Sequence, residues 1–213
     1  NQMFSARLGI ATIALCPLMV AVSVETINGL VRKASKRADY DYLTNVLSRS
    51  GIYEVLRKES PNVASGQRQM TVMLLDIDYF KSINDNYGHD CGDKILAEFA
   101  GVVNGVVGNN GWFARMGGEE FVIVCLSIDS HEALALGQQV REEVEKHNFL
   151  WDNTVHHITV SVGISWTGDT SSSLEATFNA QMSEADRCLY LAKHRGRNQL
   201  CAEGIPVINL AAS

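Results

Sequence analysis

Two pairs of carboxylates stand where they could hold a metal ion. Asp76 and Asp78 follow directly on the apolar run at residues 70–75, and Glu119 and Glu120 follow two consecutive glycines. Side chains at i and i+2 of a strand point to the same face, and like charges buried together need a cation to offset them. Oxygen ligands without nearby His or Cys favour Mg²⁺ or Mn²⁺ over zinc. Because Mg²⁺ usually joins carboxylates to substrate phosphates, phosphoryl or nucleotidyl transfer is the leading chemistry.

The glycines decide between this site and a plainer interpretation. The Asp-x-Asp pattern alone fits a solvated strand end equally well. Gly117 and Gly118 lie between two apolar strand-like runs, and two glycines favour a tight hairpin because both can take φ > 0. Glycine also lets the backbone approach a ligand closely, which favours the functional interpretation. If the strand at residues 70–75 pairs beside this hairpin, three or four carboxylates converge.

Cationic and amide groups that suit phosphate occur elsewhere in the chain. Phe80 and Lys81 begin a loop or helix whose backbone amides could meet phosphate oxygens. Lys193 and Arg197 are four residues apart near the end of the last long helix, so they can face one way and neutralise a triphosphate. Complementing the helix C-terminus is the alternative role for these two cations.

Asn84 and Asp93 could read the edge of a base. An Asp that accepts from ring N–H groups beside an Asn side chain suits guanine, whose edge offers donors next to an acceptor. Spacing in the sequence leaves open whether the two side chains meet.

Strands and helices alternate along the part of the chain that must position these groups. Apolar β-rich runs predict strands, and apolar residues at helical spacing predict helices, with Ser130 as the cap of one helix. This mixture with an antiparallel hairpin indicates an α+β sandwich. The predicted strands are 70–75, 112–115, 121–128 and 157–166, and the predicted helices are 90–107, 130–147 and 174–194.

Composition excludes several classes of protein. The 213 residues are 46% hydrophobic, which is enough for a buried core. The net charge of −6 argues against broad binding to nucleic acid, which needs a basic face. The cysteines number five, an odd count, and form no C-x-x-C pair, so a disulfide scaffold and a zinc ribbon are both disfavoured.

The first part of the chain differs in character from the rest. Residues 8–24 are uncharged, and basic residues cluster between 32 and 37. That length is at the short edge for a membrane span, and the charge bias would place the following chain in the cytoplasm. A signal peptide and a buried or interfacial helix are the alternatives. Residues 25–40 predict a helix that could pair with its twin in a dimer or serve as a plain linker.

Four motifs in order resemble one known family. The sequence GGEEF at residues 117–121 resembles the signature of GGDEF-domain diguanylate cyclases. DYLTNVLSR at 41–49 resembles the family's entry motif D-x-L-T-G-L-x-N-R, from which Asn45 and Ser48 depart. DIDYFKSINDNYGHDCGD at 76–93 and ADRCLYLAKHRGRN at 185–198 resemble its metal-and-base segment and its terminal helix.

The resemblance implies a fold like that of nucleotidyl cyclases and polymerase palms. In that fold a central, mostly antiparallel sheet is flanked by helices, here preceded by an N-terminal helix. The expected organisation is a transmembrane end at 1–24, a signalling helix at 25–40, the GGDEF domain at 41–201 and a tail at 202–213. The chain is identified as the C-terminal part of a membrane-anchored member, at the bacterial inner membrane with the catalytic domain in the cytoplasm.

The resemblance also implies a reaction. Two GTP would condense into cyclic di-GMP and two pyrophosphates across a homodimer, with two Mg²⁺ or Mn²⁺ ions per site and no nucleic acid partner. Asp76, the Ile77 carbonyl and Glu119 would hold the ions, and Glu120 would be a further ligand or the base for the 3′-hydroxyl. The substrate-binding residues would be Asn84 and Asp93 for guanine and Phe80, Lys81, Lys193 and Arg197 for the phosphates.

One departure and several alternatives remain. Many relatives carry an inhibitory R-x-x-D motif shortly before the signature, but Gly108 and Gly111 replace both charged positions here. We therefore expect no product inhibition through that site. The alternatives are a catalytically silent nucleotide-binding module, a mononucleotide cyclase or polymerase-like enzyme, and a structural dimerisation domain.

Overall fold

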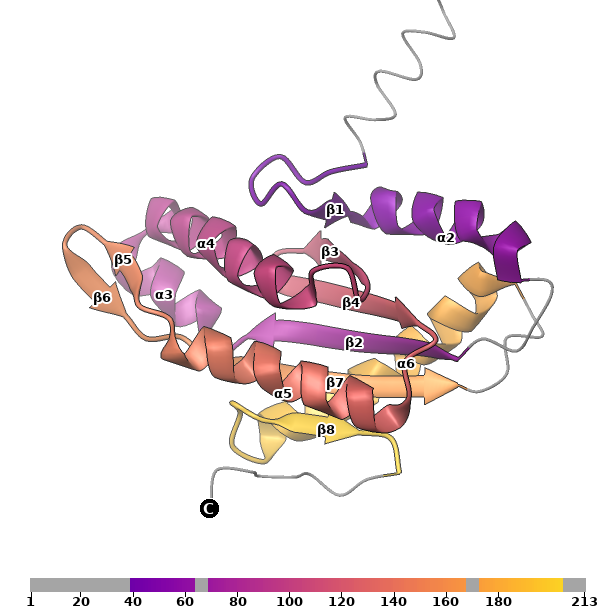
Figure 1. Ribbon diagram of the computed structural model, residues 1–213. Helices are drawn as coiled ribbons and strands as arrows, with labels where there is room; N and C mark the ends of the chain where they lie inside the picture. Colours follow the sequence, from indigo (N-terminus) through magenta and orange to yellow (C-terminus); the bar gives the residue numbers. More distant parts are fainter. Residues whose placement is uncertain (1–38, 64–68, 168–172, 205–213) are drawn as a thin grey trace, which may run out of the picture. The chain divides into compact units, whose positions relative to one another are not determined.

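The computed structural model describes residues 39–63, 69–167 and 173–204 (Figure 1). The predicted membrane segment at 1–24 and nearly all of the predicted helix at 25–40 lie outside these residues. Within the three ranges that the structure describes, no helix combines the length and apolarity that crossing a bilayer requires.

A mixed sheet forms the centre of the domain, in the order β1-β3-β4-β2-β7-β8. The inner pairs β3–β4, β4–β2 and β2–β7 are antiparallel, whereas the outer strands β1 and β8 pair in parallel. This arrangement confirms the predicted α+β class with a mostly antiparallel sheet. The strands are β1 (Leu47–Ser48), β2 (Met70–Ile77), β3 (Trp112–Gly117), β4 (Glu120–Leu126), β7 (Val160–Thr167) and β8 (Leu200–Ala202).

Helices cover both faces of this sheet. In Figure 1, α4 and α5 lie over the near face with the short α3 beside them, and α6 lies behind the sheet. Two apolar clusters correspond to these two layers, the larger one including α4 and α5 and the other one including α2 and α6. The helices are α2 (Arg49–Val63), α3 (Phe80–Tyr87), α4 (His89–Val107), α5 (Ser130–Lys146) and α6 (Leu174–His194), and a small hairpin joins β5 (Phe149–Trp151) to β6 (Thr154–His156).

Strand β2 is the centre of the core because both of its faces are covered. Met73 and Leu75 pack on the side of α4 and α5, whereas Val72 and Leu74 pack on the side of α2 and α6. A strand covered on both faces reads as a continuous apolar run instead of an alternating one. Each fully buried side chain of this kind contributes about 1.5–3 kcal/mol to folding. The end of β2, where Asp76 stands, is therefore held rigidly.

Most predicted elements are confirmed, with corrections at their ends. The cap of α5 is Asp129 and not Ser130, because Asp129 accepts a hydrogen bond from the Glu132 amide while the Glu132 side chain accepts one from the Asp129 amide. This reciprocal pair is a capping box. Strand β7 begins at Val160, later than the predicted 157. The prediction missed α2, the β5–β6 hairpin and the two parallel outer strands, all of which are short or weakly periodic.

Candidate active site

Asp76 lies at the end of β2 between two antiparallel neighbours. It stands opposite Glu120 of β4 on one side and Ser161 of β7 on the other. This register confirms that the strand predicted at 70–75 pairs beside the hairpin of the signature. The Asp76 side chain is almost fully buried, and its Oδ2 lies 2.7 Å from Nζ of Lys193.

The signature turn has the backbone that its glycines predict. Gly117 and Gly118 have φ values of 150° and 54°, both in the region that L side chains rarely adopt. Gly117 pairs with Glu120 across the hairpin, so Glu119 lies at the tip beside Glu120. The glutamates thus reach the sheet end where Asp76 stands.

Arg115 fixes this turn, a role that the sequence analysis missed. Its Nε and Nη2 donate to the Gly118 carbonyl oxygen at 2.9 and 2.8 Å, and its Nη1 donates to Oδ1 of Asp41 at 3.0 Å. Asp41 also accepts from the amide and hydroxyl of Thr44. Burial alone would raise the pKa of Asp41, but the hydrogen bonds from Thr44 and Arg115 hold it below its ordinary value. The entry motif and the signature are therefore parts of one hydrogen-bonded unit.

The charge around Asp76 is unbalanced. The pKa of Asp76 is raised to about 6, chiefly by burial and to a smaller extent by the charges of Glu119 and Glu120, while Lys193 acts in the opposite direction. The Lys193 ammonium forms its ion pair with Asp76. Among the described residues, no three His, Cys, Asp or Glu side chains are gathered closely enough to hold a metal ion. The predicted ligand set around Asp76 and the two glutamates therefore stays a prediction, and in this structure Lys193 pairs with Asp76.

The donor chemistry nevertheless fits a hard divalent cation. Asp76, Glu119 and Glu120 offer oxygen atoms, and the charges of the two glutamates add to the effect of burial in raising the pKa of Asp76. A bound cation would relieve that repulsion.

Helices α3 and α4 bring Asn84 against Gly92, the residue that precedes Asp93. A Cβ added to Gly92 would collide with Oδ1 of Asn84 and lie 3.1 Å from Cζ of Phe80. The glycine therefore permits Asn84 to lie against the start of α4, where Asp93 is the next residue. The spacing of these residues along the sequence did not predict this contact between Asn84 and Gly92.

The residues predicted to meet phosphate begin α3. The Phe80 ring is buried in the core, so its contribution to a ligand is limited to its backbone, whereas Lys81 is exposed. The Ser82 amide donates to the Tyr79 carbonyl oxygen, and no side chain among the described residues caps α3 at Tyr79, so the Phe80 and Lys81 amides are the first-turn donors that could meet another acceptor.

Lys193 and Arg197 reach the site by different routes. The prediction that both face one way on a helix is wrong, because α6 ends at His194 and Arg197 follows in a left-handed conformation with φ of 62°. Lys193 extends to Asp76, whereas the Arg197 guanidinium stacks on Tyr79 at 4.4 Å from the ring centroid. Both cations therefore lie near the end of β2 despite their different backbones.

Asp78 does not join the acidic cluster. Its carboxylate accepts from the Thr159 and Ser161 hydroxyls at 2.7 Å each and from the Asn198 amide at 3.0 Å. Ser161 stands opposite Asp76 in the sheet and its hydroxyl donates to Asp78, so both carboxylates lie on the side of the sheet that Ser161 faces, as expected. Asp78 differs from Asp76 in having neutral donors for both of its oxygens.

The region of the missing inhibitory motif lies at the start of β3. Gly108 ends α4 with φ of 50°, and a Cβ added to Gly111 would lie 2.6 Å from both Sγ of Cys125 and the Val124 oxygen. A groove of about 490 Å³ runs along residues 108–112 with Glu59 and Leu126. Gly108 and Gly111 supply no charge to it.

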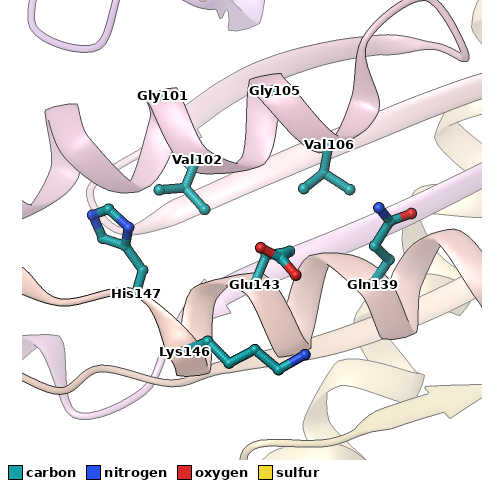
Figure 2. Close-up of a pocket in the computed structure, with 8 residues that line it drawn as sticks. All are labelled: Gly101, Val102, Gly105, Val106, Gln139, Glu143, Lys146 and His147. Carbon is teal, nitrogen blue, oxygen red and sulfur yellow. The ribbon is translucent and has the colours of Figure 1, made fainter.

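A second groove, of about 540 Å³, lies between α4 and α5 (Figure 2). Gly101 and Gly105 lie on the α4 side of it, and Gln139, Glu143 and Lys146 line it from α5. The eight residues that line this groove include none of the predicted site residues.

Comparison with known proteins identifies the family. The sequence model described as "Diguanylate cyclase, GGDEF domain" matches residues 38–199. The chain belongs to the GGDEF family. It is 50% identical over 198 residues to the probable diguanylate cyclase DgcF of Escherichia coli K12, an alignment that covers 93% of this chain and 62% of that protein. The chain spans only 41% of the DgcF of E. coli O157:H7, at the same identity.

Solved GGDEF structures share the fold. The coiled coil and GGDEF domain of DgcB from Caulobacter crescentus, in complex with c-di-GMP, matches with a TM-score of 0.73 at 27% identity, over 93% of this chain and 98% of that one. The active GGEEF domain of a diguanylate cyclase from Vibrio cholerae matches with a TM-score of 0.65 at 29% identity, over 75% and 98%. The palm-like arrangement expected from the motifs is therefore confirmed at the level of the fold.

Proposed function

We propose that this GGDEF chain is a diguanylate cyclase that condenses two GTP into cyclic di-GMP with release of two pyrophosphates. The observation that carries the proposal is the buried Asp76 carboxylate, whose pKa of about 6 reflects burial and the neighbouring Glu119 and Glu120. Such a strongly perturbed group, next to the signature turn of a GGDEF protein, is where a substrate-bound cation is most needed.

The acidic groups would hold two Mg²⁺ or Mn²⁺ ions. The ligands would be Asp76, the Ile77 carbonyl oxygen, Glu119 and Glu120. When bound, the ions would polarise the α-phosphate and stabilise the departing pyrophosphate. Lys193 would then exchange its contact with Asp76 for one with the phosphates.

The chain's own groups would bind and orient GTP. Asn84 and Asp93 would recognise guanine, and the close approach of Asn84 to Gly92, the residue before Asp93, supports this role. The α3 amides of Phe80 and Lys81 would receive phosphate oxygens. The Arg197 guanidinium would add bidentate donors to the same phosphates. Glu120 is exposed at the start of β4, from where it could take the proton of a 3′-hydroxyl.

A homodimer would be required. Each domain binds one GTP, and a product with two linkages needs two domains face to face, which turns an encounter of substrates into a positioned reaction. Residues 25–40 would pair the two chains, and residues 1–24 would attach them to the bacterial inner membrane with the catalytic domain in the cytoplasm. Alignment of the two halves would then regulate activity.

The test is a product assay on the full chain. Purified protein is incubated with GTP or ATP and Mg²⁺ or Mn²⁺, and the nucleotides are separated. We expect cyclic di-GMP from GTP only, and loss of that product in Glu120→Gln but not in Asp186→Asn, an exposed carboxylate of α6. Repeating the assay without residues 1–40 measures their contribution. Binding of GTP without any product would overturn the proposal in favour of a silent nucleotide-binding module.

A further inference from the structure

Asp78 is a buried carboxylate that joins two segments far apart in the sequence. It is only 4% exposed. Its Oδ1 accepts from the Ser161 hydroxyl, and its Oδ2 accepts from the Thr159 hydroxyl and the Asn198 backbone amide. The Asp78 amide in turn donates to the Thr159 carbonyl oxygen at 2.9 Å. Hydrogen bonds to an ionised group are roughly twice as strong as neutral ones, so this carboxylate is a strong anchor.

The segment that Asp78 anchors has an unusual backbone. Gly196, Arg197 and Asn198 have φ values of 121°, 62° and 47° in succession. Non-glycine residues in this region persist only where the surroundings determine them. The bond from Asp78 to the Asn198 amide is one such determinant, and the bond from the Arg197 amide to the Ala192 oxygen at 3.1 Å is another.

The Asn198 side chain is held from the opposite direction by α5. Its Nδ2 donates to Oε1 of Glu145 at 2.7 Å, and its Oδ1 accepts from Nη1 of Arg141 at 3.0 Å. Arg141 is buried and also donates to Oε2 of Glu145 at 2.6 Å. The loop after α6 is therefore fixed by β2 at its backbone and by α5 at its side chain.

What this loop displays is the Arg197 guanidinium. It lies 4.4 Å from the centre of the Tyr79 ring, and its Nη1 is 3.4 Å from the Tyr79 hydroxyl. Tyr79 directly follows Asp78, as Arg197 directly precedes Asn198. One carboxylate thus fixes the backbone on both sides of the stacked pair.

We propose that Asp78 and Tyr79 are positioning residues that hold the Arg197 guanidinium ready for a triphosphate at the end of β2. The inference rests on the proposed function, since it concerns the phosphates of the same substrate. Asp78 sets the backbone from which Arg197 extends, and the ring of Tyr79 sets the plane of the guanidinium. An arginine ordered in advance loses less conformational freedom when a ligand binds.

The test measures affinity and turnover separately. Asp78→Asn and Tyr79→Ala are made singly and in an Arg197→Ala background, and binding of 3′-deoxy-GTP, which cannot form the linkage, is measured by calorimetry. We expect each single variant to weaken binding and raise KM by about three- to tenfold with little change in kcat. In the Arg197→Ala background neither change has a further effect, because coupled residues are not additive.

Controls separate positioning from a general loss of structure. Asp186→Asn repeats the Asp-to-Asn change at an exposed site, and Tyr42→Ala removes a tyrosine that is 93% exposed. Amide hydrogen exchange should increase at residues 195–199 in Asp78→Asn alone. Tyr79 is 64% exposed, so its alanine variant keeps the test available if Asp78→Asn folds poorly.

The outcomes separate this inference from the proposed function. Equal losses with and without Arg197 would overturn the positioning role while leaving the cyclase intact. Coupled losses of 3′-deoxy-GTP binding in a protein that makes no cyclic di-GMP would support positioning and overturn the cyclase. A wild type that binds no 3′-deoxy-GTP would overturn both.

Discussion

The end of β2 presents two acidic residues whose partners differ in charge. Asp76 lies beside Glu120 of the hairpin and pairs with the Lys193 ammonium of α6, and burial together with the charges of Glu119 and Glu120 raises its pKa to about 6. Asp78 faces β7 and the loop after α6, where neutral donors satisfy both of its oxygens. The two regions teach that spacing alone does not assign a role. The carboxylate whose charge is poorly compensated is the one suited to ligand chemistry, and the well-compensated one serves architecture.

The largest expected effect is the difference between Asp76→Asn and Asp78→Asn in both activity and stability. Asp76→Asn should lower cyclic di-GMP synthesis by about 100-fold or more because a ligand charge is lost. It should leave unfolding free energy at pH 7 unchanged or raise it by about 1–3 kcal/mol, since a raised carboxylate pKa means that the fold disfavours the charge. Asp78→Asn should instead lower that free energy by about 1–3 kcal/mol. Denaturant titration and the product assay measure both, and stability changes of the same sign in the two variants would break the comparison.

The pH dependence should reveal the same difference. Activity that needs charged Asp76 should fall by about tenfold per unit as the pH drops below about 6, and more Mg²⁺ should move the midpoint lower by competing with the proton. The contribution of Asp76 to stability runs the other way. It is fully present below the ordinary pKa of 3.8 and is lost as the pH rises through about 6, because the folded state holds the proton more tightly. The rate of cyclic di-GMP synthesis and the free energy of unfolding are measured against pH for wild type and Asp76→Asn. Identical dependence of the unfolding free energy on pH in the two proteins would contradict the raised pKa of Asp76.

Gly92→Ala should weaken substrate recognition without touching either carboxylate. The added methyl group displaces Asn84, so KM for GTP should rise by about tenfold and discrimination against ATP should fall. Gly101→Ala is the matched control, since it lies in the same helix with no described atom near its added Cβ. It should retain activity and gain up to about 1 kcal/mol of stability. Equal kinetics for the two variants would exclude a role for the α3–α4 contact in recognition.

Arg115→Lys should have a moderate effect through the hairpin that carries Glu119. Lysine cannot reproduce the fork that spans the Gly118 oxygen and Asp41, so kcat should fall by about three- to tenfold. Arg57→Lys makes the same change in an exposed pair with Glu54 and should have almost no effect. Steady-state kinetics of the two variants distinguish a positioned turn from a dispensable ion pair.

The smallest effect is expected from product. Because Gly108 and Gly111 lack charge, micromolar cyclic di-GMP should leave the initial rate unchanged in an assay of full-length protein. Potent inhibition by micromolar cyclic di-GMP would contradict this expectation and would place a product site elsewhere in the molecule.

The sequence determined the local structure of this protein. The apolar run before Asp76 predicts a strand, the two glycines predict a turn with positive φ, and helical periodicity predicts α4 and α6 within a residue of their ends. The GGEEF signature and three further motifs also indicate the family to which the chain belongs. These features follow from preferences of short segments for particular backbone angles and for burial of one face or two. Such preferences are encoded in neighbouring residues.

Only the tertiary structure decided which partner each charged group has. Asp76 and Asp78 have the same type and the same spacing to apolar neighbours, yet Lys193 reaches one and Asn198 the other. Arg197 lies beyond the end of α6 with a left-handed backbone, and Arg115 pairs with Asp41, 74 residues away in the sequence. The strength of an ion pair or hydrogen bond depends on the distance between its groups and on their burial, and both are set only when the chain folds. The partners of the buried carboxylates are therefore properties of the fold, whereas their positions along the chain are properties of the sequence.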